Sequence, residues 1–278
     1  IFLEYTSPST GCSNTSDTTN FTINALPVTT LSIPKTLYCV TDAQDVITVQ
    51  DGATPLTDLS TVVFEIDKGS GYQANGGEIV VDLASSPNVA RMDPSVMGVF
   101  DNIKIKATYI NSDGCSDESN ELTINVKALP IPQLINLNAS GYCINGSTQT
   151  VNVQDNGSNF IINTGTNNVV FQVDTTGNGF TPPRTGSIIL SNGTNNVTLD
   201  PTKFPAGNHK IRYYYTNNNG CVDTMASTPL IIHALPTLNF TGLGATYCNN
   251  DNDITLNAFA DGATLAGDLA NVTFFISD

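Results

Sequence analysis

The stretch YYYTNNNGCVDTMASTPLIIHALP, residues 213–236, has two counterparts elsewhere in the chain. They are EYTSPSTGCSNTSDTTNFTINALP at residues 4–27 and TYINSDGCSDESNELTINVKALP at residues 108–130. Each copy contains a tyrosine, then a Gly-Cys pair, then an apolar segment that ends in Ala-Leu-Pro. The Ala-Leu-Pro motifs recur 103 and 106 residues apart. This period is far longer than the ~20–50 residues of solenoid repeats, and it predicts a tandem array of domains.

Further motifs keep the same order around each copy. A Tyr-Cys pair follows every Ala-Leu-Pro, and an Asp-Pro pair precedes two of the three tyrosine segments. The motifs are Tyr38-Cys39, Tyr142-Cys143 and Tyr247-Cys248, with Asp93-Pro94 and Asp200-Pro201. We therefore divide the chain into the end of one repeat (1–27), two complete repeats (28–130 and 131–236) and the start of a fourth (237–278).

Apolar residues alternate with polar ones inside each repeat. IKIKATY (103–109) and HKIRYYY (209–215) both place every second residue on one apolar face. This is the two-residue period of a half-buried strand, and it predicts antiparallel strands. Gly, Asn, Asp and Pro clusters separate such segments at the spacing that is typical of β-sandwiches. The sequence thus predicts an all-β protein made of tandem immunoglobulin-like sandwiches arranged end to end.

Strand assignments follow from that fold. The tyrosine segment is predicted to be strand F, NSDGCS (111–116) the F–G turn and LTINV (122–126) strand G. His209 is expected in a turn, and Tyr109 and Tyr215 in the core or in a tyrosine corner. Ala-Leu-Pro is predicted to form a short, stiff joint because proline fixes its own φ and restrains the preceding residue.

The composition excludes several functional classes. The chain has 278 residues, of which 25 are acidic and 10 are basic, and its net charge is −15. Such a surface repels phosphate backbones and anionic lipid, so we expect no nucleic-acid partner and no membrane insertion. No basic, apolar and small-residue series typical of a signal peptide is present. IFLEY at the start and NVTFFISD at the end both read as strands, so the chain is expected to be part of a longer protein.

The ordered motifs Tyr, Asn-Gly-Cys, Ala-Leu-Pro and Tyr-Cys resemble the immunoglobulin-like and PKD-like repeats of giant cell-surface proteins of Bacteroidetes. These include the gliding-motility adhesins exported by the type IX secretion system. The resemblance implies an extracellular, many-domain filament at the cell surface that takes part in attachment and gliding. Those repeats often carry a tryptophan in strand C, whereas this chain has none and places Phe64, Phe171 and Phe274 there.

The same resemblance draws attention to three Asp-Thr triplets. They are similar to the O-glycosylation acceptor motif of that phylum, although a threonine-rich sequence also produces such triplets by chance. The candidate acceptors are Thr18, Thr175 and Thr224.

Six cysteines recur with the repeats, and no zinc-binding spacing surrounds them. Their regular, even number in an extracellular chain predicts disulfides. The cysteines are Cys12, Cys39, Cys115, Cys143, Cys221 and Cys248.

Three pairing schemes respect the repeat. Neighbours could pair, giving Cys12–Cys39 and its two equivalents. Pairing inside a repeat would give Cys39–Cys115 and Cys143–Cys221, but these positions lie about one strand length apart, ~20 Å, beyond the ~6 Å that a disulfide spans. Pairing across a junction would give Cys39–Cys221, with the other cysteines seeking partners outside these residues. Sandwich topology favours the third scheme, and its outcome depends on the strand assignment.

Catalytic motifs are absent from the sequence. There is no Gly-x-Ser-x-Gly, P-loop or GxGxxG motif, and only two histidines are present. We therefore expect no enzyme activity and no cofactor. The sequence offers candidate calcium ligands in Asp42, Asp45, Asp251 and Asp253, which supply hard oxygen atoms without EF-hand spacing. The competing interpretation is that these aspartates stabilise turns.

The sequence therefore predicts a non-enzymatic, extracellular stalk that extends and presents more distal regions. Its expected partners are neighbouring repeats, other copies in a filament, and surfaces or glycans that are contacted through regions outside these residues. One alternative is a module whose loops bind glycan or calcium. Another is an accessory region of a secreted hydrolase.

Overall fold

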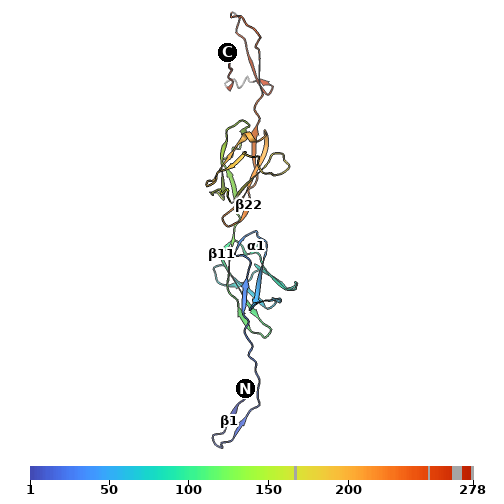
Figure 1. Cartoon of the computed structure of the whole chain (residues 1–278), viewed down its shortest axis with the longest axis vertical. Coiled ribbons are helices and arrows are strands. Elements are labelled where there is room, and N and C mark those ends of the chain that lie inside the picture. The colour runs from blue at the N-terminus through green and yellow to red at the C-terminus, as the bar shows by residue number, and fades with distance from the viewer. Residues whose placement is uncertain (166–167, 250, 265–270, 277–278) are drawn as a thin grey trace. The chain divides into compact units, whose positions relative to one another are not determined.

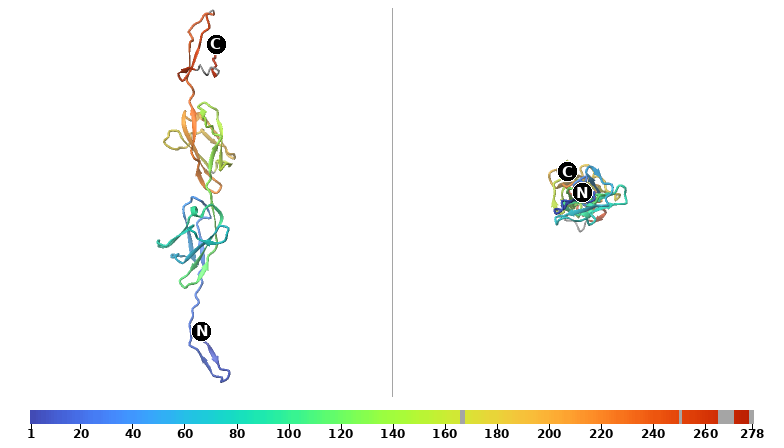
Figure 2. Two further views of the ribbon diagram at one scale, coloured as in Figure 1. Left: turned by 180° about the vertical axis from the view of Figure 1, so that it is seen from behind. Right: turned by 90° about the horizontal axis from the view of Figure 1, so that it is seen from below.

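The computed structural model describes residues 1–165, 168–249, 251–264 and 271–276. It divides into two compact units, residues 1–129 with 217–221, and residues 130–216 with 222–278. Each unit contains one complete sandwich built almost wholly of strands (Figures 1 and 2). Among the described residues no helix is long and apolar enough to cross a bilayer.

The sandwich of the first unit has two sheets with the strand orders of an immunoglobulin-like domain. One sheet has the order β3-β5-β10-β9 with β6 on β5, and the other has the order β4-β13-β11-β7-β8 with β12 on β11. The strands of the first sheet are β3 (Thr29–Ser32), β5 (Asp45–Asp51), β6 (Thr54–Pro55), β9 (Ile79–Asp82) and β10 (Val89–Met92). Those of the second are β4 (Leu37–Cys39), β7 (Val62–Asp67), β8 (Gln73–Ala74), β11 (Phe100–Ile110), β12 (Ser116–Glu118) and β13 (Leu122–Lys127).

The sandwich of the second unit repeats this arrangement. Its sheets have the orders β14-β16-β20-β19, with β17 on β16, and β15-β23-β21-β18, with β22 on β21. The strands of the first sheet are β14 (Pro132–Ile135), β16 (Gln149–Asp155), β17 (Ser158–Asn159), β19 (Ile188–Leu190) and β20 (Asn196–Leu199). Those of the second are β15 (Tyr142–Cys143), β18 (Val169–Asp174), β21 (Gly207–Thr216), β22 (Val222–Thr224) and β23 (Thr228–His233).

Each sandwich has its own apolar core, and the tyrosine strand supplies the centre of it. In the first core Ile103, Ile105 and Ala107 are at most 1% exposed; in the second, Ile211 and Tyr213 are equally buried. The alternation predicted from sequence is therefore confirmed, and so is the immunoglobulin-like, all-β fold. Phe64 and Phe171 are buried at the positions where a strand C tryptophan was expected, whereas Phe274 is half exposed.

Both Asp-Pro motifs form the same corner before strand F. Asp93 caps helix α1 (Pro94–Met97), where its Oδ1 accepts a hydrogen bond from Ser95 N at 2.9 Å. Asp200 caps the 3-10 turn η1 (Pro201–Lys203) in the same way, accepting from Thr202 N at 3.0 Å. Asp-Pro suits this position for two reasons. The carboxylate accepts a hydrogen bond from a free backbone N–H of the first turn, and proline has no N–H that would need an acceptor.

Two sequence predictions about local structure are wrong. His209 lies in β21, opposite Leu230 of β23, and is only 4% exposed, because strand F begins at Gly207 rather than after the histidine. The segment NVTFFISD was predicted to be a strand, but its described residues 271–276 form none, and residues 277–278 lie outside the described part of the chain. The outer segments otherwise contain a hairpin of β1 (Glu4–Thr6) and β2 (Ser13–Thr15), and a sheet of β24 (Leu238–Thr241), β25 (Asn257–Ala260) and β26 (Ala263–Thr264).

Candidate functional site

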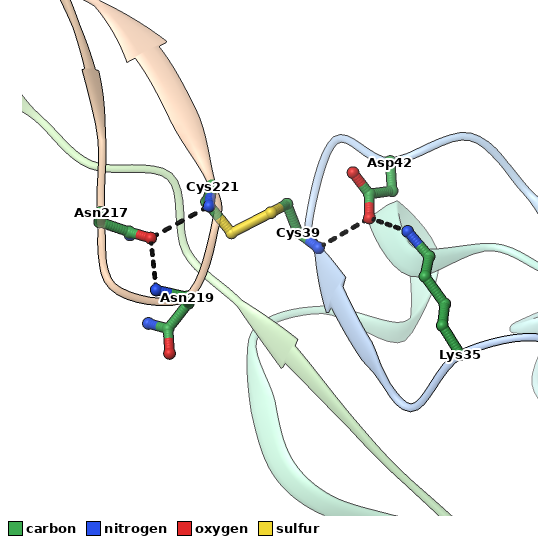
Figure 3. Close-up of a disulfide and its surroundings, with 6 residues drawn as sticks. All are labelled: Lys35, Cys39, Asp42, Asn217, Asn219 and Cys221. Atoms are coloured by element: carbon green, nitrogen blue, oxygen red, sulfur yellow. Dashed lines mark hydrogen bonds and ion pairs between the residues drawn. A yellow bond between two sulfur atoms is a disulfide. The ribbon is translucent and has the colours of Figure 1, made fainter. Parts of the chain in front are cut away.

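A disulfide joins Cys39 to Cys221, two residues that are 182 positions apart in the sequence. The Cα atoms are 5.6 Å apart, as is normal for this bond. Cys221 ends the turn 217–221, which groups with the first unit although the strands on either side of it, β21 and β22, pair with each other in the second. Figure 3 shows the bond between this turn and the end of β4.

The backbone fixes the Cys39 side of the bond. β4 pairs in parallel with β13, which places Cys39 opposite Lys127 at the end of strand G. Val40 N then donates to Lys127 O at 2.9 Å, and Asp42 N donates to Cys39 O at 2.9 Å. Cys39 therefore occupies a turn that is held on both sides of the residue.

Asp42 closes this turn electrostatically. Its Oδ2 accepts hydrogen bonds from Lys35 Nζ at 2.7 Å and from Cys39 N at 3.1 Å (Figure 3). The Lys35 hydrogen bond is the main cause that lowers the pKa of the Asp42 carboxyl, and partial burial opposes it. The carboxylate thus stays ionised and holds the cysteine backbone across the neutral pH range.

Tyr38 anchors β4 in the first core. Its ring is fully buried, its hydroxyl donates to Asp45 Oδ2 at 3.1 Å, and Lys35 Nζ lies 4.5 Å from the ring centroid. Burial first, and then the hydrogen bond to Asp45, raise the pKa of the Tyr38 hydroxyl. The Tyr-Cys pair therefore combines a core anchor with an adjacent thiol.

Asn217 fixes the turn on the Cys221 side of the disulfide, although none of the sequence motifs described above includes this residue. Asn217 Oδ1 accepts hydrogen bonds from Asn219 N and Cys221 N, each at 3.0 Å (Figure 3). Gly220 has φ +81°, a left-handed conformation that favours glycine, which explains the Gly-Cys pair. The available signal was an asparagine four residues before the cysteine, present in NNNGC and NSDGC alike.

An aspartate at a turn accepts a hydrogen bond from the backbone N–H of the residue that follows each Ala-Leu-Pro. Asp51 Oδ1 accepts from Val28 N at 2.8 Å, Asp155 Oδ1 from Ile131 N at 2.7 Å, and Asp261 Oδ1 from Thr237 N at 2.8 Å. The prolines before the first two of these residues, Pro27 and Pro130, are buried. The residue after each Ala-Leu-Pro is therefore hydrogen-bonded at the end of β5 or β16, or directly after β25.

Two of the four calcium candidates serve as turn caps. Asp42 caps Cys39, and Asp251 Oδ2 accepts from Cys248 N at 2.7 Å in the same way. Asp45 is the acceptor of the Tyr38 hydroxyl, and Asp253 is exposed. In the described part of the chain, no three His, Cys, Asp or Glu side chains are grouped closely enough to hold a metal ion.

The three candidate glycosylation residues lie in different settings. Thr18 is exposed in an irregular segment after β2. Thr175 is half-buried and follows β18, and Thr224 is half-buried in β22, paired with Tyr214. Among these three, Thr18 has the greatest steric access for an added sugar.

No family model and no curated protein matches this chain. Solved structures with a similar arrangement include the I67–I69 fragment of titin, at 10% identity and a TM-score of 0.41 over 77% of this chain and 68% of that one. A calcium-stabilised adhesin from an Antarctic bacterium that binds ice has 9% identity and a TM-score of 0.40, over 88% of this chain and 59% of that one. A marsupial T cell receptor has 10% identity and a TM-score of 0.41, over 83% and 80%. At these TM-scores the similarities carry no conclusion about function.

Proposed function

We propose that this chain is a non-enzymatic stalk segment of an extracellular adhesin, in which consecutive immunoglobulin-like repeats are covalently tied together. The proposed repeats are residues 1–27, 28–130, 131–236 and 237–278. The observation that supports this function best is the Cys39–Cys221 bond, because it joins two of the proposed repeats across 182 residues of sequence. Disulfides also form and persist mainly in oxidising environments such as the extracellular space.

The bond would change the path of tension along the chain. Force applied to the two ends enters at Cys39, crosses the disulfide and leaves at Cys221. The intervening segment contains almost all of both apolar cores, and it would carry no tension. Only the parts outside this segment, which include β3 of the first sandwich and β22 and β23 of the second, would carry the tension.

Single-molecule stretching of the 278-residue chain tests the proposal. Under oxidising conditions the 182-residue segment stays closed, whereas the double variant Cys39→Ser/Cys221→Ser releases it. The fully stretched variant should then be longer by on the order of 600 Å, at roughly 3.5 Å per residue. Cys115→Ser is the matched control and should stretch like the unmodified chain.

Equal lengths for the double variant and the unmodified chain would overturn the tension path. Titration calorimetry with Ca²⁺ and with a glycan panel provides the second readout, and a stalk should give no binding heat. Saturable heat would instead favour the alternative function of a glycan- or calcium-binding module.

A further inference from the structure

The Gly-Cys turn that forms the disulfide occurs a second time with a free cysteine. Asn111 Oδ1 accepts from Asp113 N at 3.1 Å and from Cys115 N at 2.9 Å, as Asn217 does for Asn219 and Cys221. Asn111 N also donates to Cys115 O at 3.0 Å, and Gly114 has φ +79°. The free Cys115 is therefore presented by the same turn as the bonded Cys221.

The Tyr-Cys end of β4 also recurs with a free cysteine. Cys143 ends β15, which pairs in parallel with β23 and places Cys143 opposite His233, as Cys39 lies opposite Lys127. Ile144 N donates to His233 O at 2.9 Å, and Gly146 N donates to Cys143 O at 2.8 Å. These bonds correspond to those of Val40 and Asp42, and Cys143 is exposed.

Cys12 and Cys248 share some of the backbone hydrogen bonds and turn geometry that surround the bonded cysteines. Asp251 caps Cys248 as Asp42 caps Cys39, and Asp251 N donates back to Cys248 O at 3.0 Å. Gly11 has φ +70° before Cys12, and Ser7 N donates to Cys12 O at 2.9 Å, in a turn one residue longer than the other two. Both cysteines are exposed and free.

We propose that each of these free cysteines is one partner of a disulfide that recurs between consecutive repeats. The Tyr-Cys thiol of each repeat bonds to the Gly-Cys thiol of the repeat that follows it. Cys143 and Cys248 therefore take a Gly-Cys turn as their partner, and Cys115 and Cys12 take a Tyr-Cys strand end. This inference rests on the proposed function, and it names the partner as another repeat of this same architecture.

Bond formation needs an external disulfide as oxidant, for example glutathione disulfide. One cysteine thiolate attacks it, forms a mixed disulfide and releases one reduced glutathione. The thiolate of the partner cysteine then attacks the mixed disulfide, which closes the protein bond and releases a second reduced glutathione. Two protein thiols are oxidised and one glutathione disulfide is reduced, so protons and electrons balance.

A lengthened chain tests this inference directly. A second copy of residues 131–236 is inserted after Pro236, which gives Cys143 a following Gly-Cys turn and keeps every natural joint sequence. The inserted copy carries Val222→Ile as a mass label, at a side chain that is 49% exposed. After equilibration with oxidised and reduced glutathione, non-reducing peptide mapping should find Cys143 bonded to the labelled Cys221.

The Cys39–Cys221 bond is the internal control for correct folding, and Cys143→Ser in the original copy should abolish only the labelled crosslink. If Cys39–Cys221 forms while Cys143 and the labelled Cys221 both stay alkylatable, the recurring bond is overturned and the proposed function stands. If Cys39–Cys221 also fails to form, the proposed function falls as well.

Discussion

The Asp42 carboxylate gives the joint a defined pH dependence at the scale of a single residue. Because its folded pKa is lowered from the ordinary 3.8, its contribution to stability is fully present above about pH 4 and is lost as the pH falls through the lower folded value. We expect Asp42→Asn to lower the free energy of unfolding at pH 7 and to have less effect near pH 2. Urea unfolding at both pH values measures this difference. Asp113→Asn, at an exposed turn position, is the control, and a pH-independent effect of Asp42→Asn would contradict the argument.

Tyr213 makes a second prediction at this scale. Its single hydroxyl proton is shared between Gln133 O at 2.8 Å and Gln154 O at 3.0 Å, and its ring is fully buried. Tyr213→Phe should lower the free energy of unfolding by about 1–2 kcal/mol, because the two carbonyls lose the one buried donor that they share. Tyr214→Phe is the matched control, since that half-buried hydroxyl has only a 3.4 Å contact with Arg212. Equal unfolding midpoints for the two variants in urea would refute the role of the buried hydroxyl.

At the scale of elements, hydrogen exchange can test the hydrogen bond by which Asp155 anchors Ile131, the residue before β14. Asp155→Ala removes the acceptor of Ile131 N, and a hydrogen bond to a charged group is worth about 1.5–3 kcal/mol. The exchange rate of the Ile131 amide should therefore rise by about tenfold or more. Gln149→Ala, on the same strand β16, removes only bonds to Ser147 and should leave that amide unchanged. Unaltered protection of Ile131 in Asp155→Ala would exclude the carboxylate as its anchor.

The sequence was most informative where alternation coincides with burial. Strand F, its turn and strand G were predictable because Ile103, Ile105 and Ile211 repeat with period two. The hydroxyl that ties strand F to the opposite sheet belongs to Tyr213. Tyr109 and Tyr215 were predicted to lie in the core or in a tyrosine corner; Tyr215 is buried in the second core and Tyr109 packs against the first. The sequence does not show which of three consecutive tyrosines donates to a carbonyl of the opposite sheet, because the choice depends on how the two sheets are aligned.

The site was less accessible from sequence than the fold. Cysteine spacing left three pairing schemes open, and strand polarity supplied the preference among them. The cap by Asn217 was missed because asparagines are abundant, so an asparagine four residues before a cysteine is a weak signal until the turn is seen. The turn role of Asp42 competed with a calcium role, and carboxylate chemistry alone fits both.

At the scale of the whole molecule, the disulfide should couple the unfolding of the two sandwiches. If either sandwich unfolds while the other stays folded, the bond closes a loop of roughly 90 residues, whose closure is worth up to about 4–5 kcal/mol in the chain-entropy model. When both are unfolded the closed loop spans 182 residues, and the corresponding value rises only to about 5 kcal/mol. Almost all of the stabilisation therefore falls on the first unfolding step, whichever sandwich takes it.

Cys39→Ser/Cys221→Ser should accordingly lower the free energy of the first step by several kcal/mol and leave the second nearly unchanged. Hydrogen exchange in increasing urea can follow the two cores separately, through Ile105 and Ile211, which are both at most 1% exposed. Cys115→Ser removes a free thiol without opening the bond, so both steps should match those of the unmodified chain. A bond that links the two sandwiches should lower the free energy of the first unfolding step only. An equal loss in both steps would therefore mean that the disulfide stabilises each sandwich separately and does not link them.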